Sequence, residues 1–349
     1  NGHNGSANAS GNVGVWGTAV EAKKYGINQW FLHKATEAEI NVLTTDVKVV
    51  DGVATITTSG TLTAAAYAAA LGKVDVASIT SLDLRSTGIS VATLNPSQIK
   101  NAELGLGANT VYYLPTGYSA SMPNFVIDGN CVQLILTDKE SFAPASGFTV
   151  SNAIYWKSGL DGAGWYSAVL PFDVVIPEGM QVLGNATVSN SSISFEEITA
   201  GTTISAGTPF IYKTAENAVN FSTDNVTIPD NATPSTSGAL KGTYVKIPKG
   251  SATGKLILNA AGSAFATATA NASIPAFRAY IDGAVGSGTF TITINDDLTG
   301  VVGADADLNA KVDVYSVDGK LVRQGVESIT ALQGLESGIY IINGKTIKK

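Results

Sequence analysis

The sequence predicts a mainly β protein with a short leucine-rich-repeat segment, an antiparallel β-sandwich and a small C-terminal β module. Three observations support this fold class. Short apolar segments alternate with clusters of Gly, Pro, Asn and Ser between residues 155 and 298, with almost no helical periodicity. A pattern of regularly spaced apolar residues precedes them. Two strand–turn patterns lie near the end of the chain.

Residues 1–60 are expected to form a flexible N-terminus followed by a small α/β cap. The first seventeen residues are rich in Gly, Asn, Ser and Ala and have little apolar surface to bury. Residues 18–32 and 37–43 are compatible with short helical or irregular elements. The segment 47–58 predicts a β-hairpin, because Asp51-Gly52 supplies the positive φ angles of a two-residue type I′ turn.

Residues 61–154 are expected to form a leucine-rich-repeat-like domain. Its first element is an alanine-rich helix over residues 62–71, which Gly72 ends. The repeat places apolar residues on a short strand, with a polar residue bridging the turn that follows. The copies are expected at residues 79–89, 104–111 and 122–132, with a frayed copy at 148–150. Their bridging positions are Thr87, Asn109 and Asn130.

Residues 155–298 are expected to form the β-sandwich, since many short strands with turn residues between them favour two packed antiparallel sheets. The apolar segments are Trp165–Leu170, Val182–Leu183, Ile193–Ile198, Pro209–Tyr212, Val226–Ile228, Tyr244–Ile247, Lys255–Leu258, Ala276–Ile281 and Thr289–Ile294.

Residues 299–349 are expected to form the C-terminal module, after a polar linker over residues 296–307. The segment 312–323 predicts two strands around an Asp318-Gly319 turn. A further strand then leads into a second turn at residues 343–344. A module of this size is too small to hold a catalytic cleft.

Composition narrows the range of partners. Only 14% of the 349 residues are charged and the net charge is −7. The only cluster of basic residues is at the very end of the chain, so neither nucleic acid nor an anionic membrane surface is an expected partner. No stretch approaches the roughly 20 apolar residues of a membrane span. The chain begins with Asn1 rather than Met, which suggests that a signal peptide precedes this sequence.

Residues suited to catalysis or metal binding are scarce. His3 and His33 are the only histidines and Cys131 is the only cysteine, so neither a hydrolase triad nor a zinc site is expected. Cys131 is expected to be a buried hydrophobic residue. No cofactor is expected, except a weak calcium site. That site would use Asp305, Asp307 and Asn309, which match the first, third and fifth ligands of an EF-hand loop, although its Gly and Glu positions are occupied by Ala and Ser.

Two further groups of residues suggest ligand chemistry. Paired carboxylates for glycoside cleavage have candidates in Asp161, Asp173, Glu178, Glu196 and Glu197. The second group is aromatic: large rings stand on both sides of a glycine-rich loop that contains Asp161. Flat rings with nearby hydrogen-bonding groups hold sugars and anchor protein interfaces. The alternative is that strand alternation places some rings in the core and the others on the surface. The candidate binding residues are Tyr155, Trp156, Asp161, Trp165 and Tyr166.

Three segments carry a family resemblance. Residues 164–179 and 198–212 resemble segments of large surface proteins from Bacteroidetes-type bacteria, and the tail over 312–344 resembles the C-terminal sorting domain of Por-type secretion. The resemblance covers roughly residues 75–349. It implies export to the cell surface or medium and binding of a host protein or glycan. The tail after Gly344 is shorter than the last hairpin of such sorting domains.

The sequence therefore favours a non-enzymatic, exported adhesion or recognition protein. One alternative is a carbohydrate-active enzyme that uses paired carboxylates, and another is a passive surface scaffold. The enzyme requires a groove with two carboxylates about 5–10 Å apart. The scaffold predicts that no concave site is present.

Overall fold

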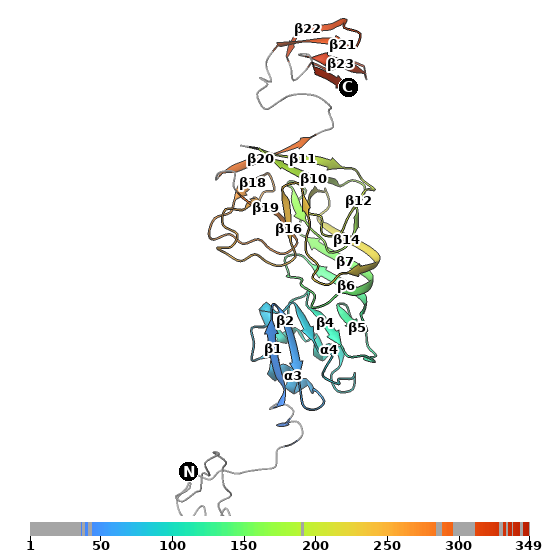
Figure 1. Ribbon diagram of the computed structural model, residues 1–349, viewed down its shortest axis with the longest axis vertical. Helices are drawn as coiled ribbons and strands as arrows, with labels where there is room; N and C mark the ends of the chain where they lie inside the picture. Colours follow the sequence, from blue (N-terminus) through green and yellow to red (C-terminus); the bar gives the residue numbers. More distant parts are fainter. Residues whose placement is uncertain are drawn as a thin grey trace, which may run out of the picture.

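The computed structural model describes residues 36, 39–40, 44–189, 192–283, 288–295, 311–327, 331–332, 334–336, 338–342 and 345–348. This part of the chain is mainly β, as predicted, and its strands lie in four sheets (Figure 1). The expected elements over residues 18–32 and the linker over 296–307 lie outside it, as does nearly all of 37–43. Within the described residues, no helix is long and apolar enough to cross a membrane.

The first sheet has eight strands, and its order follows the sequence up to its last member. Strands β2 to β5 run parallel to one another, β6 is parallel to β7, and β7 is antiparallel to β14. The members are β1 (Asp46–Val50), β2 (Val53–Thr57), β3 (Ser81–Asp83), β4 (Val111–Leu114), β5 (Phe125–Ile127), β6 (Asn130–Thr137), β7 (Phe148–Ser158) and β14 (Ala218–Ile228).

The predicted hairpin is confirmed as β1 and β2. Its turn residues Asp51 and Gly52 have φ angles of 50° and 80°, as a type I′ turn requires. A Cβ atom at Gly52 would stand 2.8 Å from Thr80 Oγ1. Glycine is therefore needed both for the turn and for the close approach of the next loop.

The predicted alanine-rich helix is confirmed as α3 (Ala64–Leu71). Thr63 caps it by accepting a hydrogen bond from the Ala66 amide. Its buried face includes Tyr67 and packs with Leu82 on β3 in one apolar cluster. The other helices described are the short η1 (Val76–Ser78), α4 (Pro96–Ile99) and η2 (Ala102–Leu104).

The spacing predicted for the repeat is wrong in its second copy. Leu104 lies in the 3-10 helix η2, which Gly105 ends with a left-handed φ of 74°, and Leu106 follows in a loop. The strand at this place is β4, which begins at Val111. In the third copy the strand is present as β5, but Asn130 begins β6 instead of bridging a turn. Apolar spacing alone did not distinguish a helical turn from a strand.

Two buried asparagines connect the loops that lead into β4 and β5 to backbone groups in and just after β6. Asn109 donates to the carbonyls of Thr137 (2.9 Å) and Glu140 (2.7 Å) and accepts from the Thr137 amide (2.6 Å). Asn124 donates to the Ile135 carbonyl (3.1 Å) and accepts from the Ile135 amide (2.8 Å). Asn109 therefore bridges backbone groups, but before its strand rather than after it.

The second sheet has ten strands and curls on itself. The turn between its first two strands, β15 and β16, comes back to β10, where the Ala239 amide donates to the Ala186 carbonyl at 2.7 Å. The members, in spatial order, are β15 (Thr236–Ser237), β16 (Leu240–Thr243), β19 (Arg278–Ile281), β17 (Leu256–Leu258), β18 (Ala264–Thr267), β20 (Thr289–Asn295), β11 (Ser192–Ile198), β10 (Gln181–Val188), β13 (Phe210–Lys213) and β8 (Tyr166–Ala168).

This arrangement differs from the expected division of the chain at residues 154 and 155. That boundary falls in the middle of β7, which pairs with β6 on one side and β14 on the other. Strands from both sides of the boundary therefore share one sheet. The ten-stranded sheet also has a parallel pair, β11 with β20. A small pair, β9 (Val174–Val175) with β12 (Thr203–Ile204), stands apart.

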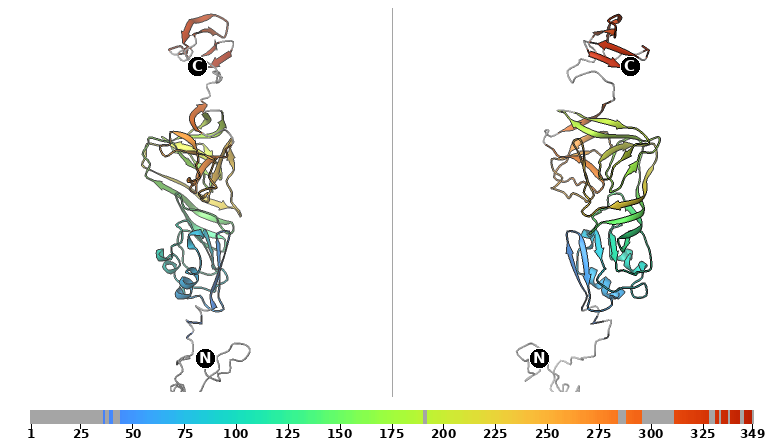
Figure 2. Two further views of the ribbon diagram at one scale, coloured as in Figure 1. Left: turned by 90° about the vertical axis from the view of Figure 1, so that its left-hand side faces the viewer. Right: turned by 45° about the vertical axis from the view of Figure 1, so that its right-hand side comes forward.

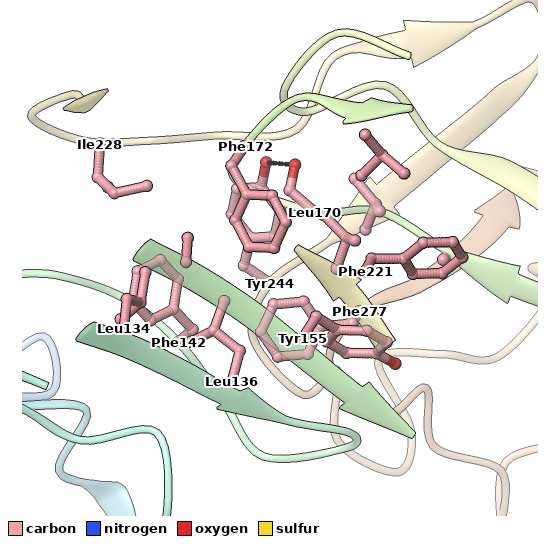
Figure 3. Close-up of a cluster of buried hydrophobic side chains, with 14 of the residues drawn as sticks. Leu134, Leu136, Phe142, Tyr155, Leu170, Phe172, Phe221, Ile228, Tyr244 and Phe277 are labelled. Atoms are coloured by element: carbon pink, nitrogen blue, oxygen red, sulfur yellow. Dashed lines mark hydrogen bonds between the residues drawn. The ribbon is translucent and has the colours of Figure 1, made fainter. Parts of the chain in front are cut away.

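The two large sheets share an apolar core (Figure 3). Tyr155 and Phe221 reach it from the eight-stranded sheet, and Phe277, next to β19, packs edge-on against Tyr155. The segment 244–247, predicted as a strand, is instead a loop after β16. Its Tyr244 ring enters the core and its hydroxyl donates to the Leu170 carbonyl at 3.0 Å. Figure 2 shows the blue strands and the green-to-orange strands lying end to end. The blue strands β1 to β3 pack in a separate apolar cluster with α3.

The C-terminal strands form a separate four-stranded sheet. β21 (Lys311–Ser316) and β22 (Leu321–Glu327) are the predicted pair around Asp318-Gly319, where Gly319 has a φ of 83°. β23 (Ile339–Ile342) and β24 (Lys345–Lys348) are antiparallel. The turn predicted between them, at 343–344, lies outside the described residues.

Candidate functional site

Four charged residues, Asp138, Lys139, Lys157 and Arg278, line a cavity of about 370 Å³ where the end of β7 meets the ten-stranded sheet. We call it the Lys157 cavity. The lining residues that matter for its chemistry are Asp138, Lys157, Trp165, Tyr166, Asn259 and Arg278. A second cavity, of about 400 Å³, lies beside the β1–β2 turn, but Asp51 is the one charged group among its described lining residues.

Strand alternation in β7 places Lys157 at this cavity. Ala153, Tyr155 and Lys157 point to the buried face, while Trp156 between them points the other way and is 46% exposed. Lys157 is only 6% exposed. Lys157 therefore lies on the same face of β7 as the core residues Ala153 and Tyr155, but its side chain lines the cavity.

A buried ion pair forms one wall. Asp138, just after β6, receives Arg278 Nη1 at 2.5 Å and Nη2 at 2.7 Å, so the guanidinium binds it through two parallel bonds. The Tyr155 hydroxyl donates to the same carboxylate at 2.6 Å. Burial opposes ionisation of Asp138, but the hydrogen bonds and charge of Arg278 outweigh it and lower its pKa. The carboxylate is therefore ionised and accepts three hydrogen bonds from the protein.

Lys157 has no such partner. Its amine lies 4.7 Å from the centroid of the Tyr166 ring and 5.6 Å from that of Tyr212, within cation–π range. No hydrogen-bond acceptor from the described residues pairs with it. Burial lowers the pKa of Lys157 to about 7; nearby Arg278 acts in the same direction and Asp138 opposes it. The amine thus loses its proton much more readily than an ordinary lysine does.

The glycine-rich loop after β7 holds the aromatic rim. Tyr166 donates its hydroxyl hydrogen to Asp161 Oδ1 at 2.8 Å and accepts from the Asp161 amide at 2.9 Å. The hydrogen bond from Tyr166 lowers the pKa of Asp161. The Trp165 amide donates to the Gly262 carbonyl at 2.9 Å. A Cβ at Gly164 would lie 2.1 Å from the Ala261 carbonyl oxygen, so this close approach requires glycine.

The five predicted binding residues do not form one site. Trp165 and Tyr166 line the cavity, and Asp161 fixes Tyr166 from outside it. Tyr155 is completely buried in the core, and Trp156 is on the opposite face of the sheet. Alternation along β7 separates these two rings, which is the alternative that the sequence left open.

The other candidate residues do not meet at this cavity. Of the described residues that line it, Asp138 alone has a carboxyl group. Asp173 instead accepts from the Ala206 amide at 2.8 Å, and Glu197 receives the Gln181 side chain at 3.4 Å. Across the described residues, no group of three or more His, Cys, Asp and Glu side chains is placed to hold a metal. The predicted calcium ligands at 305, 307 and 309 lie outside the described residues.

Cys131 is buried on β6, and its burial raises the pKa of the thiol to about 11. The thiol is therefore protonated at neutral pH, which excludes it as a nucleophile in this state. Sequence reasoning missed Asp138, Lys157 and Arg278. Only Lys157 had a local signal, since it lies two residues beyond Tyr155 in a strand with alternating burial.

Comparison with protein-family models, with curated proteins and with solved structures finds no match to this chain. The residues and the geometry of the cavity are therefore the basis on which we assign a function.

Proposed function

We propose that this chain is an exported recognition protein that binds a sugar unit of a glycan in the Lys157 cavity without chemically changing it. The single observation that carries the proposal is the combination of aromatic surface and unused polar groups in one cavity. Trp165 and Tyr166 line the same cavity as Lys157, whose amine lies 4.7 Å from the Tyr166 ring centroid and has no acceptor among the described residues. The cavity volume is within the roughly 300–1,000 Å³ typical of small-ligand sites.

The absence of turnover in this proposal follows from the chemistry of the wall. Glycoside cleavage requires a carboxyl group that donates a proton and a second one that acts as a base or nucleophile. The Asp138 carboxylate is ionised and already holds Arg278 and Tyr155. The described lining residues add no second carboxyl group. Binding through ring faces and hydrogen bonds fits these groups better than hydrolysis.

The remaining parts of the proposal concern architecture and location. The parallel strands β2 to β5 support a leucine-rich-repeat-like unit, because parallel strands joined by short helical turns are the building plan of such repeats. The two large sheets around a shared core support a sandwich-like body. The four-stranded C-terminal sheet supports a sorting-domain-like module, and the low content of charged residues fits an extracellular location.

A glycan array followed by titration calorimetry on the intact chain tests the proposal. Trp165→Ala is expected to lower the affinity for a glycan identified on the array by up to about tenfold, since an aromatic contact contributes about 0.5–1.5 kcal/mol. Trp156→Ala is the matched control, because that ring is on the opposite face of the same region. The proposal is wrong if no glycan binds, or if Trp156→Ala weakens binding as much as Trp165→Ala.

A further inference from the structure

We infer that the sugar recognised in the Lys157 cavity carries a carboxylate, as a uronic or sialic acid does, and that Lys157 pairs with this group. The inference rests on the proposed function, because it specifies the ligand class of the same site. Three features of the cavity lead to it: its charge balance, the unmatched amine of Lys157, and the neighbours that face this amine.

The residues that line the cavity carry a net positive charge, although the net charge of the whole chain is negative. Lys139, Lys157 and Arg278 line it with one carboxylate, Asp138, which leaves two net positive charges when Lys157 is protonated (three minus one). Asp161, at the outer end of Tyr166, reduces this by one if it is included. The whole chain has a net charge of −7. A local excess of positive charge in a cavity attracts anions and raises their local concentration.

The two inner cations differ in what they have available for a ligand. Arg278 is bound by Asp138 through two bonds, so its charge is already neutralised. Lys157 has only the faces of two tyrosine rings. A buried cation without a counter-ion is costly, and an opposite charge that also accepts a hydrogen bond removes that cost. A ligand carboxylate beside the amine supplies both.

Among the described residues, the elements packed around Lys157 offer no carboxylate that is not already paired with another cation. Asp138 and Lys139 follow β6, Tyr155 is on β7 itself, Tyr166 is on β8, Tyr212 is on β13 and Arg278 is on β19. Burial raises the pKa values of all three tyrosines, so they are neutral at physiological pH.

The Tyr212 hydroxyl lies close behind this wall. It is buried and has no hydrogen-bond partner among the described residues. Its ring centroid is 5.7 Å from that of Tyr166. An unsatisfied buried hydroxyl beside an unmatched amine is unusual in a region that serves only for packing. Tyr212 is not one of the residues that line the cavity, so its hydroxyl adds an unsatisfied polar group next to the lining residues Lys157 and Tyr166.

Pairing with a carboxylate couples binding to proton uptake. Free Lys157 has a pKa of about 7, so most of it is unprotonated at pH 8 and above. A bound carboxylate favours the ammonium form and raises this pKa. Binding above pH 7 therefore takes up nearly one proton, and the affinity falls by up to tenfold per pH unit there. A neutral sugar has no such dependence.

The test is calorimetric titration of the intact chain with a glucuronic-acid-containing oligosaccharide and with its neutral glucose counterpart. We expect at least tenfold tighter binding of the acidic sugar at pH 6, and a much smaller preference at pH 9. Measurements at pH 8 in HEPES and in Tris, which differ in ionisation enthalpy, give the number of protons taken up, expected to approach one. A sulfated neutral oligosaccharide shows whether any anion is sufficient.

Three variants assign the effect to Lys157. Lys157→Met is expected to lose most of the difference between acidic and neutral sugar. Lys157→Arg keeps the charge but does not titrate, so the acidic preference is expected to remain while its pH dependence disappears. Lys241→Met is the control, because that lysine is exposed and pairs with Asp282 at 2.7 Å. Circular dichroism verifies that each variant is folded.

The outcomes separate the two claims. Equal binding of acidic and neutral sugars at pH 6 overturns the carboxylate inference and leaves the proposed function in place. A sulfated sugar that binds as tightly as the glucuronate also overturns it, because a general anion site would then suffice. Failure of every glycan to bind overturns both. An acidic preference that Lys157→Met does not reduce shows that another cation recognises the ligand.

Discussion

Two lysines lie against tyrosine rings in different regions of this protein, and their surroundings differ in one respect. Lys100, beside the parallel strands, lies 5.5 Å from the Tyr112 ring centroid and donates to the Pro123 carbonyl at 2.9 Å. Lys157 has two rings and no acceptor among the described residues. Burial lowers the pKa of both amines, and that of Lys157 falls to about 7.

The same contrast holds for the neutral polar groups. In the parallel region, the buried side chains of Asn109 and Asn124 use both their donors and their acceptors on backbone groups. Beside the Lys157 cavity, the buried Tyr212 hydroxyl has no partner among the described residues. Satisfied polar groups contribute to stability, whereas unsatisfied ones reduce it unless a ligand completes them. The difference separates a region built for stability from one suited to binding.

The largest effect is expected from breaking the parallel region at Asn109. Asn109→Ala leaves two carbonyls and one amide without their partner, and we expect a loss of about 4 kcal/mol in the free energy of unfolding. Denaturant unfolding measures this loss. Asn130→Ala, an exposed position on β6, is the control and should change stability by less than about 1 kcal/mol. Equal losses in both variants would contradict the structural role given to Asn109.

A substitution in the cavity is expected to have the opposite sign. The folded pKa of Lys157 is about 7 against an ordinary 10.5, so the unfolded chain binds more protons between these values. Lys157 therefore destabilises the fold at pH 6, and stability rises as the pH increases from 7 to 10. Lys157→Met should stabilise the protein by roughly 3–5 kcal/mol at pH 6 and by about 1 kcal/mol or less at pH 10.

Denaturant unfolding at several pH values between 6 and 10 measures this difference. Lys241→Met is again the comparison, since its amine is exposed and paired, and it should show no such gain at pH 6. A destabilised Lys157→Met at pH 6 would mean that the amine makes a stabilising contact, and the contrast between the two regions would then fail.

The smallest effect is expected at Lys100. Lys100→Met removes a buried cation, which is favourable, and leaves the Pro123 carbonyl without its donor, which is unfavourable. These terms are of similar size, so we expect a change within about 1 kcal/mol at pH 6. Unfolding under the same conditions measures it. A gain as large as that of Lys157→Met would show that the acceptor does not distinguish the two lysines.

Local signals in the sequence predicted a large part of the fold. Asp51-Gly52 specified the first hairpin because its turn needs positive φ at both positions. The alanines of residues 64–71 specified a helix. Leu104 and Leu106 misled, because their spacing matches a strand while Asn101 caps a 3-10 turn and Gly105 ends it. The curling of the ten-stranded sheet depends on contacts such as Ala186 with Gly238, which no local pattern contains.

The candidate site was only partly predictable for the same reason. Trp165 and Tyr166 stood out because large rings beside a glycine-rich loop are visible in the sequence. Asp138 and Arg278 are 140 residues apart in the chain and meet only in the folded sheet arrangement. Lys157 resembled a surface residue because lysine is usually exposed. The alternating burial along β7 instead predicts that Lys157 lies on the buried face, and this signal outweighs the residue type.

The continuity of the eight-stranded sheet through β7 limits how this protein can exchange parts during evolution. A crossover near residue 154 would divide β7 between two parents. The half from one parent would then have to pair with β14 from the other, and the second half with β6 from the first. Recombination there would join half-strands from different parents across a shared apolar core. The segment 44–295 is therefore expected to be inherited as one block. The C-terminal sheet, whose strands pair only with one another among the described residues, is a unit that can be gained or lost.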